Sequence, residues 1–443
     1  MRRLFGTDGI RGRANKYPMT GDVAFRLGAA VVYASGAEKP RIVVGKDTRA
    51  SGYIFEYAIA SGICSAGGDI LFVGVLPTPA IAYLTKKLNA DAGIVISASH
   101  NPAEDNGIKI FSGTGFKMED EKEEKIEGIM FSSHLPAEKR YGKAYRIATA
   151  VRDYIDFAKS TANVSLKGIR IVVDCANGAA YAVAKPVFEE LNAEVIVLNN
   201  TPNGENINKN CGALHTEGLA DAVLKNQANL GIALDGDADR IIVIDENGSE
   251  IDGDEIMYVC STLLKRENKL KHSTVVATLM SNAGLEESLS KQGIKLIRAK
   301  VGDRYVIDEM RKEGYNFGGE QSGHIIFMEH TTTGDGIICG LQLLKAVVSE
   351  QKPISELAKG MQKYPQILIN VPVKDKKDFS EMENVSVLIK QAEKELEGKG
   401  RVLVRYSGTE NLARVMIEAK TKETAEMHAK KIANALKEEN RIP

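Results

Sequence analysis

The chain has little net charge, few cysteines and no long apolar run. Its 58 Lys and Arg residues nearly balance 59 Asp and Glu residues, so no broad basic field is available for nucleic acid or anionic lipid. The five cysteines are scattered and never spaced as C-x-x-C, which argues against a disulfide framework or a zinc site. No run approaches the roughly 18 apolar residues of a membrane span, and the N-terminus has no apolar signal core. We therefore expect a cytoplasmic protein that binds neither nucleic acid nor membrane.

Short Val/Ile/Leu-rich runs alternate with amphipathic segments along all 443 residues. This rhythm is typical of βαβ units around buried, parallel or mixed sheets. At about 150 residues per domain the length suggests about three domains, with two or four also compatible. Restarts of the rhythm divide the chain into four units, namely 1–153, 154–253, 254–366 and 367–443. The first three have similar α/β patterns, and the last predicts a smaller α+β domain with its own core.

Individual elements follow from the same pattern. The first unit is expected to hold strands over 41–44, 70–73, 94–96 and 108–111. The second is expected to hold strands over 170–174 and 194–198 with a helix over 179–191 between them, and the third a strand over 295–299. The charged block 117–125 is expected to form a solvated helix face without a functional role.

A small hydroxyl-rich segment follows one of the predicted strands. The apolar run 94–96 ends in Ser97-Ala98-Ser99, followed by His100, Asn101 and a proline that stops further strand pairing. This arrangement presents a hydroxyl at the end of a strand, although an ordinary turn would have the same composition. The local pattern does not decide between Ser97 and Ser99.

An acidic loop follows a second predicted strand, over 230–234. Asp235, Asp237 and Asp239 alternate with small residues, so their carboxylates can converge on one point. Three such charges repel one another unless a cation lies among them, and a hard divalent ion, Mg²⁺ above all, fits oxygen ligands. Arg240 comes directly afterwards, and a guanidinium there could hold phosphate oxygens that the metal leaves free.

Two further loops carry polar donors. Residues 318–324, Gly-Gly-Glu-Gln-Ser-Gly-His, suit sugar hydroxyls, and residues 405–410, Arg-Tyr-Ser-Gly-Thr-Glu, resemble a phosphate nest. Arg11 and Arg304 are additional candidates for contact with an anion. A serine, a metal held by carboxylates, arginines and a phosphate nest together indicate phosphoryl transfer, which needs mainly positioning and neutralisation of oxygen charge.

The ordered motifs 6–12, 97–102 with Lys109, 235–240, 318–324 and 405–410 resemble those of the α-D-phosphohexomutase superfamily. Gln321 and the segments 301–306 and 332–336 are most similar to the bacterial branch that acts on glucosamine phosphates. The resemblance implies three similar α/β domains with mixed sheets around a central cleft, plus a C-terminal α+β domain. These four domains would carry, in order, the phosphoserine, metal-binding, sugar-recognition and phosphate-binding loops.

The resemblance also implies roles for single residues. It selects Ser99 over Ser97 as the carrier of the phosphoryl group, and it makes Ser99, Asp235, Asp237 and Asp239 the ligands of one Mg²⁺ per chain. The expected catalytic residues are Ser99, Lys109, Arg11, His100, Arg240 and His324. The expected substrate-binding residues are Arg304, Glu320, Gln321, Ser322, Arg405, Ser407, Gly408, Thr409 and Arg414.

The activity implied is an isomerase that interconverts glucosamine 6-phosphate and glucosamine 1-phosphate, supplying amino-sugar precursor for UDP-N-acetylglucosamine and peptidoglycan. A glucosamine 1,6-bisphosphate, or a similar sugar bisphosphate, would be intermediate and activator. The expected partner is a small amino-sugar phosphate, and a homodimer is left open. The alternatives are a phosphoglucomutase or phosphomannomutase with the same residues, and a non-catalytic protein that binds sugar phosphates.

Overall fold

The computed structural model describes residues 4–6, 8–132, 140–398, 400–407 and 411–439. The chain forms two compact units, the first from residues 1–280 and 294–360 and the second from residues 281–293 and 361–443. Each unit has hydrophobic core clusters of its own. No helix among the described residues is long and apolar enough to cross a membrane.

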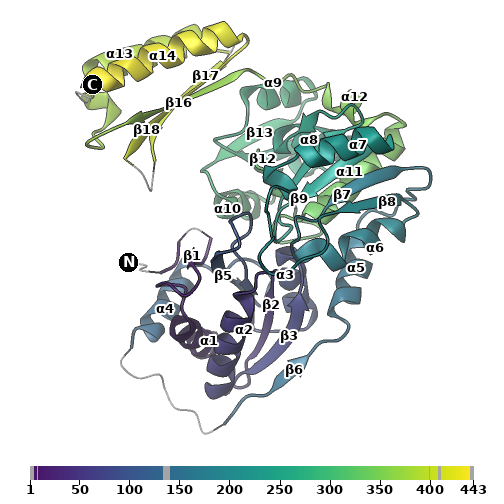
Figure 1. Cartoon of the computed structure of the whole chain (residues 1–443). Helices are drawn as coiled ribbons and strands as arrows, with labels where there is room; N and C mark the ends of the chain where they lie inside the picture. Colours follow the sequence, from purple (N-terminus) through teal and green to yellow (C-terminus); the bar gives the residue numbers. More distant parts are fainter. Residues whose placement is uncertain (1–3, 7, 133–139, 399, 408–410, 440–443) are drawn as a thin grey trace. The chain divides into compact units, whose positions relative to one another are not determined.

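The first sheet of the first unit has the strand order β1-β5-β4-β2-β3-β6. Strands β2, β3, β4 and β6 run parallel, whereas β5 and β1 complete one edge in antiparallel fashion. Helices α1, α2 and α4 share one core cluster with the sheet, and α3 contacts β2, β4 and β5 (Figure 1). The elements are β1 (Ile10–Arg13), α1 (Gly21–Ser35), β2 (Arg41–Lys46), α2 (Gly52–Ser65), β3 (Asp69–Val75), α3 (Thr78–Lys87), β4 (Ala92–Ile96), β5 (Asp105–Ser112), α4 (Asp120–Met130) and β6 (Ala144–Arg146).

The second sheet has the order β11-β10-β9-β7-β8, again with a parallel centre, β9-β7-β8, and an antiparallel edge. Its elements are α5 (Ala150–Ser160), β7 (Arg170–Asp174), the 3₁₀ helix Ala179–Ala182, α6 (Ala184–Glu189), β8 (Glu194–Leu198), the 3₁₀ helix Gly212–Leu214, α7 (Glu217–Asn226), β9 (Leu230–Leu234), β10 (Ile241–Asp245) and β11 (Glu250–Ile251).

The third sheet has the order β13-β12-β14-β15, in which only β15 is antiparallel to its neighbour. Its strands are β12 (Thr274–Thr278), β13 (Lys295–Ala299), β14 (Phe317–Gly319) and β15 (Ile325–Phe327). The helices of this part of the first unit are α8 (Gly253–Arg266), the 3₁₀ helix Lys271–Ser273, α10 (Asp303–Glu313), α11 (Gly336–Glu350) and α12 (Ile354–Ala358).

The second unit has a three-stranded antiparallel sheet, β16-β18-β17. Helix α14 contacts β16 and β18, and α13 contacts β17. Its elements are α9 (Ala283–Lys291), β16 (Gln366–Pro372), the 3₁₀ helix Phe379–Glu381, α13 (Glu383–Glu395), β17 (Gly400–Tyr406), β18 (Leu412–Ala419) and α14 (Lys422–Glu439).

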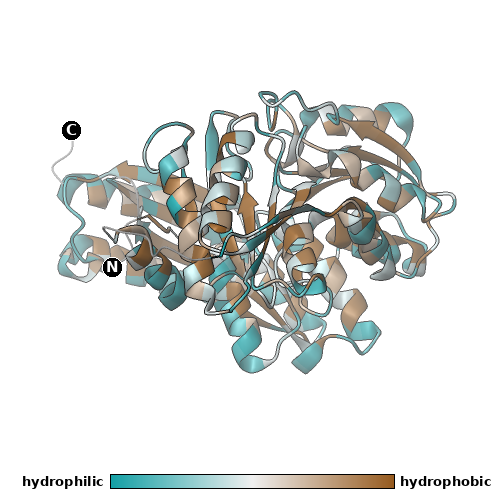
Figure 2. Cartoon of the chain, turned by 90° about the horizontal axis from the view of Figure 1, so that it is seen from below, coloured by the Kyte–Doolittle hydropathy of each residue, from teal (hydrophilic) through white to brown (hydrophobic). Residues whose placement is uncertain are grey.

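The predicted fold class, three α/β sheets followed by an α+β domain, is confirmed. The central strands β4 and β9 are buried along their whole length, because sheets covered on both faces need continuous apolar runs. Figure 2, coloured by hydropathy, shows mostly brown strands and helices in which teal and brown residues alternate. The boundaries between the four domains drawn from the sequence remain predictions.

One predicted element is wrong in detail. The helix expected over 179–191 is a 3₁₀ turn, Ala179–Ala182, followed by the short helix α6 from Ala184. Pro186 has no backbone N–H to donate, so it is tolerated in the first turn of a helix and not in the interior. A continuous helix would have placed this proline in its interior.

Candidate active site

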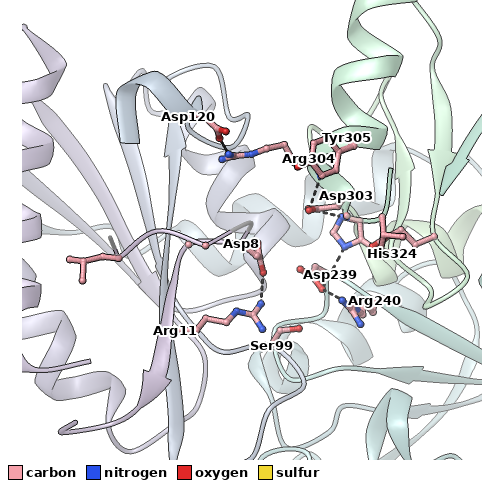
Figure 3. A pocket seen from close by; sticks show the side chains of 16 residues that line it. Asp8, Arg11, Ser99, Asp120, Asp239, Arg240, Asp303, Arg304, Tyr305 and His324 are labelled. Atoms are coloured by element: carbon pink, nitrogen blue, oxygen red, sulfur yellow. Dashed lines mark hydrogen bonds and ion pairs between the residues drawn. The ribbon is translucent and has the colours of Figure 1, made fainter. Parts of the chain in front are cut away.

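A cavity of about 470 Å³ lies in the first unit. Residues that follow strands of all three sheets line it, together with the N-terminal segment. Figure 3 shows Asp8 and Arg11 on one side of this cavity, and Asp303, Arg304, Tyr305 and His324 on the other. The loops at the carboxyl ends of parallel strands meet at one edge of a sheet, which is where open α/β sheets bind ligands.

Ser99 follows β4 and reaches this cavity from a strained backbone position. Its φ is +52°, a left-handed conformation that costs a residue other than glycine about 1–3 kcal/mol. Its Oγ donates a hydrogen bond of 2.5 Å to Oδ2 of Asp235 and lies 3.3 Å from Nδ1 of His100. Burial and the guanidinium groups of Arg240 and Arg11 lower the pKa of His100 to about 4, so the imidazole is neutral near pH 7.

Ser97 is buried, and its hydroxyl bonds to Asp47 instead of to a residue of the acidic loop. Its hydroxyl donates to Oδ2 of Asp47 at 2.6 Å and accepts the N–H of Ser99 at 2.9 Å. The Ser97 hydroxyl therefore both donates and accepts a hydrogen bond within the protein. The two serines that the local sequence pattern left equivalent thus have different surroundings.

The three aspartates of the acidic loop converge directly after β9. Asp235, Asp237 and Asp239 are all buried, and each offers an oxygen within 4.8 Å of the others. The buried atoms Oδ1 of Asp237 and Oδ1 of Asp239 have no hydrogen-bond partner among the described residues. Burial and the two neighbouring carboxylates raise the pKa of Asp235 well above its usual range. Crowded carboxylates with unused oxygen lone pairs fit a hard divalent cation, so this group could bind a metal ion.

Lys109 on β5 supplies a buried positive charge to the same loop. Its Nζ lies 3.0 Å from Oδ2 of Asp237, 3.3 Å from Oδ2 of Asp239 and 3.3 Å from Oδ2 of Asp8. Burial alone would lower the pKa of Lys109, but these carboxylates outweigh it and raise the pKa well above its ordinary value. Lys109 is therefore a charged ammonium group here, which favours charge stabilisation over proton abstraction.

Two arginines line the cavity near Ser99. Arg11 on β1 forms an ion pair with Asp8. Arg240 donates its backbone N–H to Oδ1 of Asp235 at 3.2 Å, and its guanidinium Nε is 4.0 Å from Oδ1 of Asp239. Both guanidinium groups can therefore meet the oxygens of an anionic ligand in the cavity.

His324, from the loop before β15, lies on the third-sheet side of the cavity. Its Nδ1 is 3.7 Å from Oδ1 of Asp239, and its Nε2 accepts the N–H of Gly334 at 2.9 Å. Burial alone would lower the pKa of His324, but the carboxylates of Asp239, Asp303 and Glu320 raise it above the ordinary value. Glu320 also lines the cavity, and burial raises the pKa of its carboxyl group.

The remaining residues of the third-sheet side differ in their access to the cavity. Arg304 lines it but also donates to the carbonyl of Met118 at 2.7 Å and forms ion pairs with Asp120 and Glu123. Gln321 donates to Oδ2 of Asp252 at 3.3 Å. Gln321 and the exposed Ser322 are not among the residues that line the cavity.

The predicted phosphate nest belongs to the second unit. Arg405 on β17 and Arg414 on β18 are direct partners in the antiparallel register, and burial together with Arg414 lowers the pKa of Arg405. Ser407 donates its N–H to the carbonyl of Leu412 at 2.8 Å, and its own carbonyl accepts from Lys376 Nζ at 2.7 Å. Adjacent cations of this kind suit an anion. Gly408 and Thr409 lie outside the described residues.

Some charged side chains of the block 117–125 are buried in ion pairs, although the sequence predicted a solvated helix face. Lys117 is buried between Asp8 and Asp303, forming ion pairs with both. Glu123 is buried against Arg304, and a second glutamate of α4, Glu127, accepts the N–H groups of Leu4 and Phe5. The prediction of a solvated helix face is therefore wrong for Lys117 and Glu123. A mixed charge pattern fits both roles, and only the strands and loops packed against α4 distinguish them.

Comparison with known proteins gives matches along the whole chain. Family models described as phosphoglucomutase/phosphomannomutase alpha/beta/alpha domains I, II and III match residues 2–136, 152–248 and 252–364, and the C-terminal domain of that family matches residues 368–435. A phosphoglucosamine mutase from Citrifermentans bemidjiense is 53% identical over 426 residues, covering 94% of each chain. One from Myxococcus xanthus is 53% identical over 442 residues, covering 98% of this chain and 96% of the other.

Solved structures show the same fold at low identity. A phosphoglucomutase/phosphomannomutase family protein from Burkholderia thailandensis superimposes with a TM-score of 0.81 at 24% identity, covering 98% of this chain and 97% of the other. The N-acetylphosphoglucosamine mutase of Aspergillus fumigatus, solved with GlcNAc-6P and magnesium, has a TM-score of 0.66 at 17% identity, covering 99% and 96% of the two chains.

Proposed function

Because this chain belongs to the phosphoglucomutase/phosphomannomutase family, we propose that it interconverts glucosamine 6-phosphate and glucosamine 1-phosphate. An isomerase that moves a phosphoryl group within a sugar phosphate is the activity of this family. The choice of glucosamine is supported by relatives named phosphoglucosamine mutase at 52–53% identity over almost the full length.

One observation carries the mechanism: the hydroxyl of Ser99 is held at the acidic loop. Its Oγ is 2.5 Å from Asp235, whose neighbours in the loop are also buried and aimed at the same point. Phosphorylated Ser99 would transfer its phosphoryl group to a free substrate hydroxyl. The P–O bond to Ser99 breaks, a P–O bond to the sugar forms, and a 1,6-bisphosphate results. Returning the other phosphoryl group to Ser99 completes the isomerisation.

Asp235, Asp237, Asp239 and the oxygen on Ser99 would hold one Mg²⁺ per chain. Such an ion, when bound, neutralises charge on phosphoryl oxygens and orients them. The other charges come from the chain itself. Lys109, Arg11 and Arg240 place positive groups around Ser99, so they would stabilise the negative charge that spreads over the transferring phosphoryl group.

Besides Asp235, to which the Ser99 hydroxyl donates, His100 offers a second acceptor for the proton of Ser99. When Ser99 attacks the bisphosphate, its Oγ must lose a proton. Nδ1 of His100 lies 3.3 Å away, and its low pKa leaves a free lone pair on the ring near pH 7. A conjugate acid of low pKa returns the proton readily in the reverse direction.

Two sets of residues would bind the substrate. Glu320, His324 and Arg304 line the cavity and would contact the sugar. The Arg405–Ser407 segment and Arg414, together with Gly408 and Thr409, would hold the phosphate that is not reacting. Gln321 and Ser322 remain proposals from family resemblance, because neither lines the cavity.

A comparison of substrates tests the proposal. Glucosamine, glucose and mannose 6-phosphates would be supplied separately with Mg²⁺ and a trace of sugar bisphosphate, and formation of each 1-phosphate would be followed. We expect the highest kcat/KM with the glucosamine substrate. A preference for glucose or mannose phosphate would favour the rival mutase activities, and binding without turnover of any substrate would favour a non-catalytic protein.

A further inference from the structure

A short segment packs against the serine loop and holds its backbone through hydrogen bonds. It consists of Asp47, Thr48, Arg49 and Ala50, between β2 and α2. The side chain of Arg49 is completely buried, which is rare for an arginine without multiple partners. The segment lies outside the five ordered motifs of the family, and it does not line the cavity.

Arg49 binds three parts of the serine loop through its guanidinium group. Its Nη2 donates to the carbonyl of Ser99 at 2.9 Å and to that of Asn101 at 2.8 Å, and its Nη1 donates to the carbonyl of Pro102. Its Nε donates to Oδ2 of Asp47 at 2.9 Å. The planar guanidinium thus supplies donors to three carbonyls of the serine loop at once.

Asp47 connects the same arginine to the backbone N–H of Ser99. Its Oδ2 accepts the hydroxyl of Ser97 at 2.6 Å, and that hydroxyl accepts the N–H of Ser99 at 2.9 Å. Arg49 therefore reaches both polar groups of the Ser99 backbone, the carbonyl directly and the N–H through Asp47 and Ser97.

These contacts matter because the backbone of Ser99 has a left-handed conformation, which is unfavourable for a serine without support from its surroundings. Its φ of +52° persists only if the surroundings enforce it. Asn208 adds a second donor to the Ser99 carbonyl at 2.8 Å. With both backbone groups fixed, the Oγ atom is directed at Asp235. A loop that relaxed towards ordinary φ values would move the hydroxyl away from the acidic residues.

We propose that Arg49 is a positioning residue for phosphoryl transfer, which holds Ser99 in its left-handed conformation through the Ser99 carbonyl and the Asp47–Ser97 pair. The proposal rests on the proposed function, since it concerns the same serine. Arg49 touches no substrate atom in this role. Its effect should appear in the rate of transfer and in the environment of the phosphoserine, and not in the affinity for the sugar phosphate.

The test is Arg49→Lys, which keeps the positive charge beside Asp47 but cannot bridge three carbonyls. Wild-type and variant enzymes would be phosphorylated with glucose 1,6-bisphosphate and examined by ³¹P NMR and steady-state kinetics. A displacement of about 1 Å lowers turnover by about 10²-fold, so we expect that loss in kcat with KM changed less than about threefold. The phosphoserine resonance should shift or broaden.

Arg26→Lys is the matched control. Arg26 also donates to backbone carbonyls, those of Met130 and Ser132, but it lies outside the cavity and should leave kcat and the resonance unchanged. A second variant, Ser97→Ala, removes one hydroxyl and decides the question if Arg49→Lys does not fold. Its control is Ser261→Ala, which removes another buried hydroxyl, one bonded to Tyr258.

Wild-type kcat in Arg49→Lys, or a lower kcat with an unchanged ³¹P resonance, would overturn the positioning role. If Arg49→Lys is unfolded, the same two results in Ser97→Ala do so. A wild-type enzyme that turns over no hexose phosphate would overturn the proposed function and this role together. An active wild type with unaffected variants overturns only the role of Arg49.

Discussion

The Oγ atom of Ser99 lies 2.5 Å from Oδ2 of Asp235, although 136 residues separate them in the chain. Ser99 follows a strand of the first sheet, and Asp235 follows a strand of the second. The contact joins the predicted phosphoryl carrier to the predicted metal loop. It is the geometric basis of the first two predictions.

Replacement of Ser99 by Ala should abolish turnover while leaving the fold intact. The change removes the only atom of this side chain that can carry a phosphoryl group, and alanine tolerates the same backbone conformation no worse than serine does. We expect no phosphorylated species in intact-mass spectra and a folded protein whose free energy of unfolding is lowered by at most about 3 kcal/mol, because the buried Asp235 loses one donor. Ser65→Ala, which loses a hydroxyl bonded to the carbonyl of Gly62, is the control. Substantial residual turnover in Ser99→Ala would exclude the covalent step.

Asp235→Asn should have opposite effects with and without divalent metal. In metal-free protein, burial and the neighbouring carboxylates of Asp237 and Asp239 raise the pKa of Asp235, so a neutral amide at this position should increase the free energy of unfolding. With Mg²⁺, loss of a charged ligand should weaken binding by at least about 10-fold. Thermal unfolding in EDTA and across a Mg²⁺ titration measures both effects. The variant Asp221→Asn, at an exposed position, should change neither; a destabilised metal-free Asp235→Asn would contradict the repulsion argument.

Asp335 should make the stability of the first unit depend on pH between about 4 and 6. It caps α11 by accepting the N–H groups of Ile337 and Ile338, and it accepts the hydroxyl of Tyr154. Burial raises its pKa to about 6. The folded state therefore binds more protons than the unfolded state in this window, and this group's contribution to stability falls as pH rises through it.

The shift of about two pKa units corresponds to roughly 3 kcal/mol. Asp335→Asn retains an oxygen for the cap and should flatten this part of the pH profile, as measured by urea unfolding at pH values of about 4.5, 5.5 and 6.5. An unchanged profile would show that Asp335 does not titrate in this range. Asp221→Asn again serves as an exposed control.

Gly236→Ala should impair turnover through contact with the serine loop. A Cβ at this position would lie 2.6 Å from the carbonyl oxygen of Ser99 and 2.8 Å from Nδ2 of Asn208. The two loops must then separate, and we expect kcat to fall by about 10²-fold. Gly218→Ala is the control, because a Cβ at Gly218 meets no atom within 4 Å. Wild-type kcat in Gly236→Ala would mean that the loops adjust without displacing Ser99.

Local sequence patterns were sufficient for much of the fold. The strands Arg170–Asp174, Glu194–Leu198, Leu230–Leu234 and Lys295–Ala299 have the bounds that their apolar runs indicated. Sheets covered on both faces require such runs, so the information is local. The acidic loop could also be predicted from the sequence, because three carboxylates that alternate with small residues at the end of a strand are typical of a cation site.

Tertiary structure decided what each polar side chain contacts. Ser97 and Ser99 are equivalent as a pattern, and they differ only because Asp47 lies beside one and Asp235 beside the other. The sequence predicted a solvated Lys117, whereas in the structure Asp8 and Asp303, from distant segments of the chain, form ion pairs with it. Periodicity records which face of an element is buried, whereas charge pairing, pKa and strain depend on neighbours far away in sequence. For that reason the sequence determined the elements and the candidate chemistry, and the packing of the sheets determined which serine faces the acidic loop.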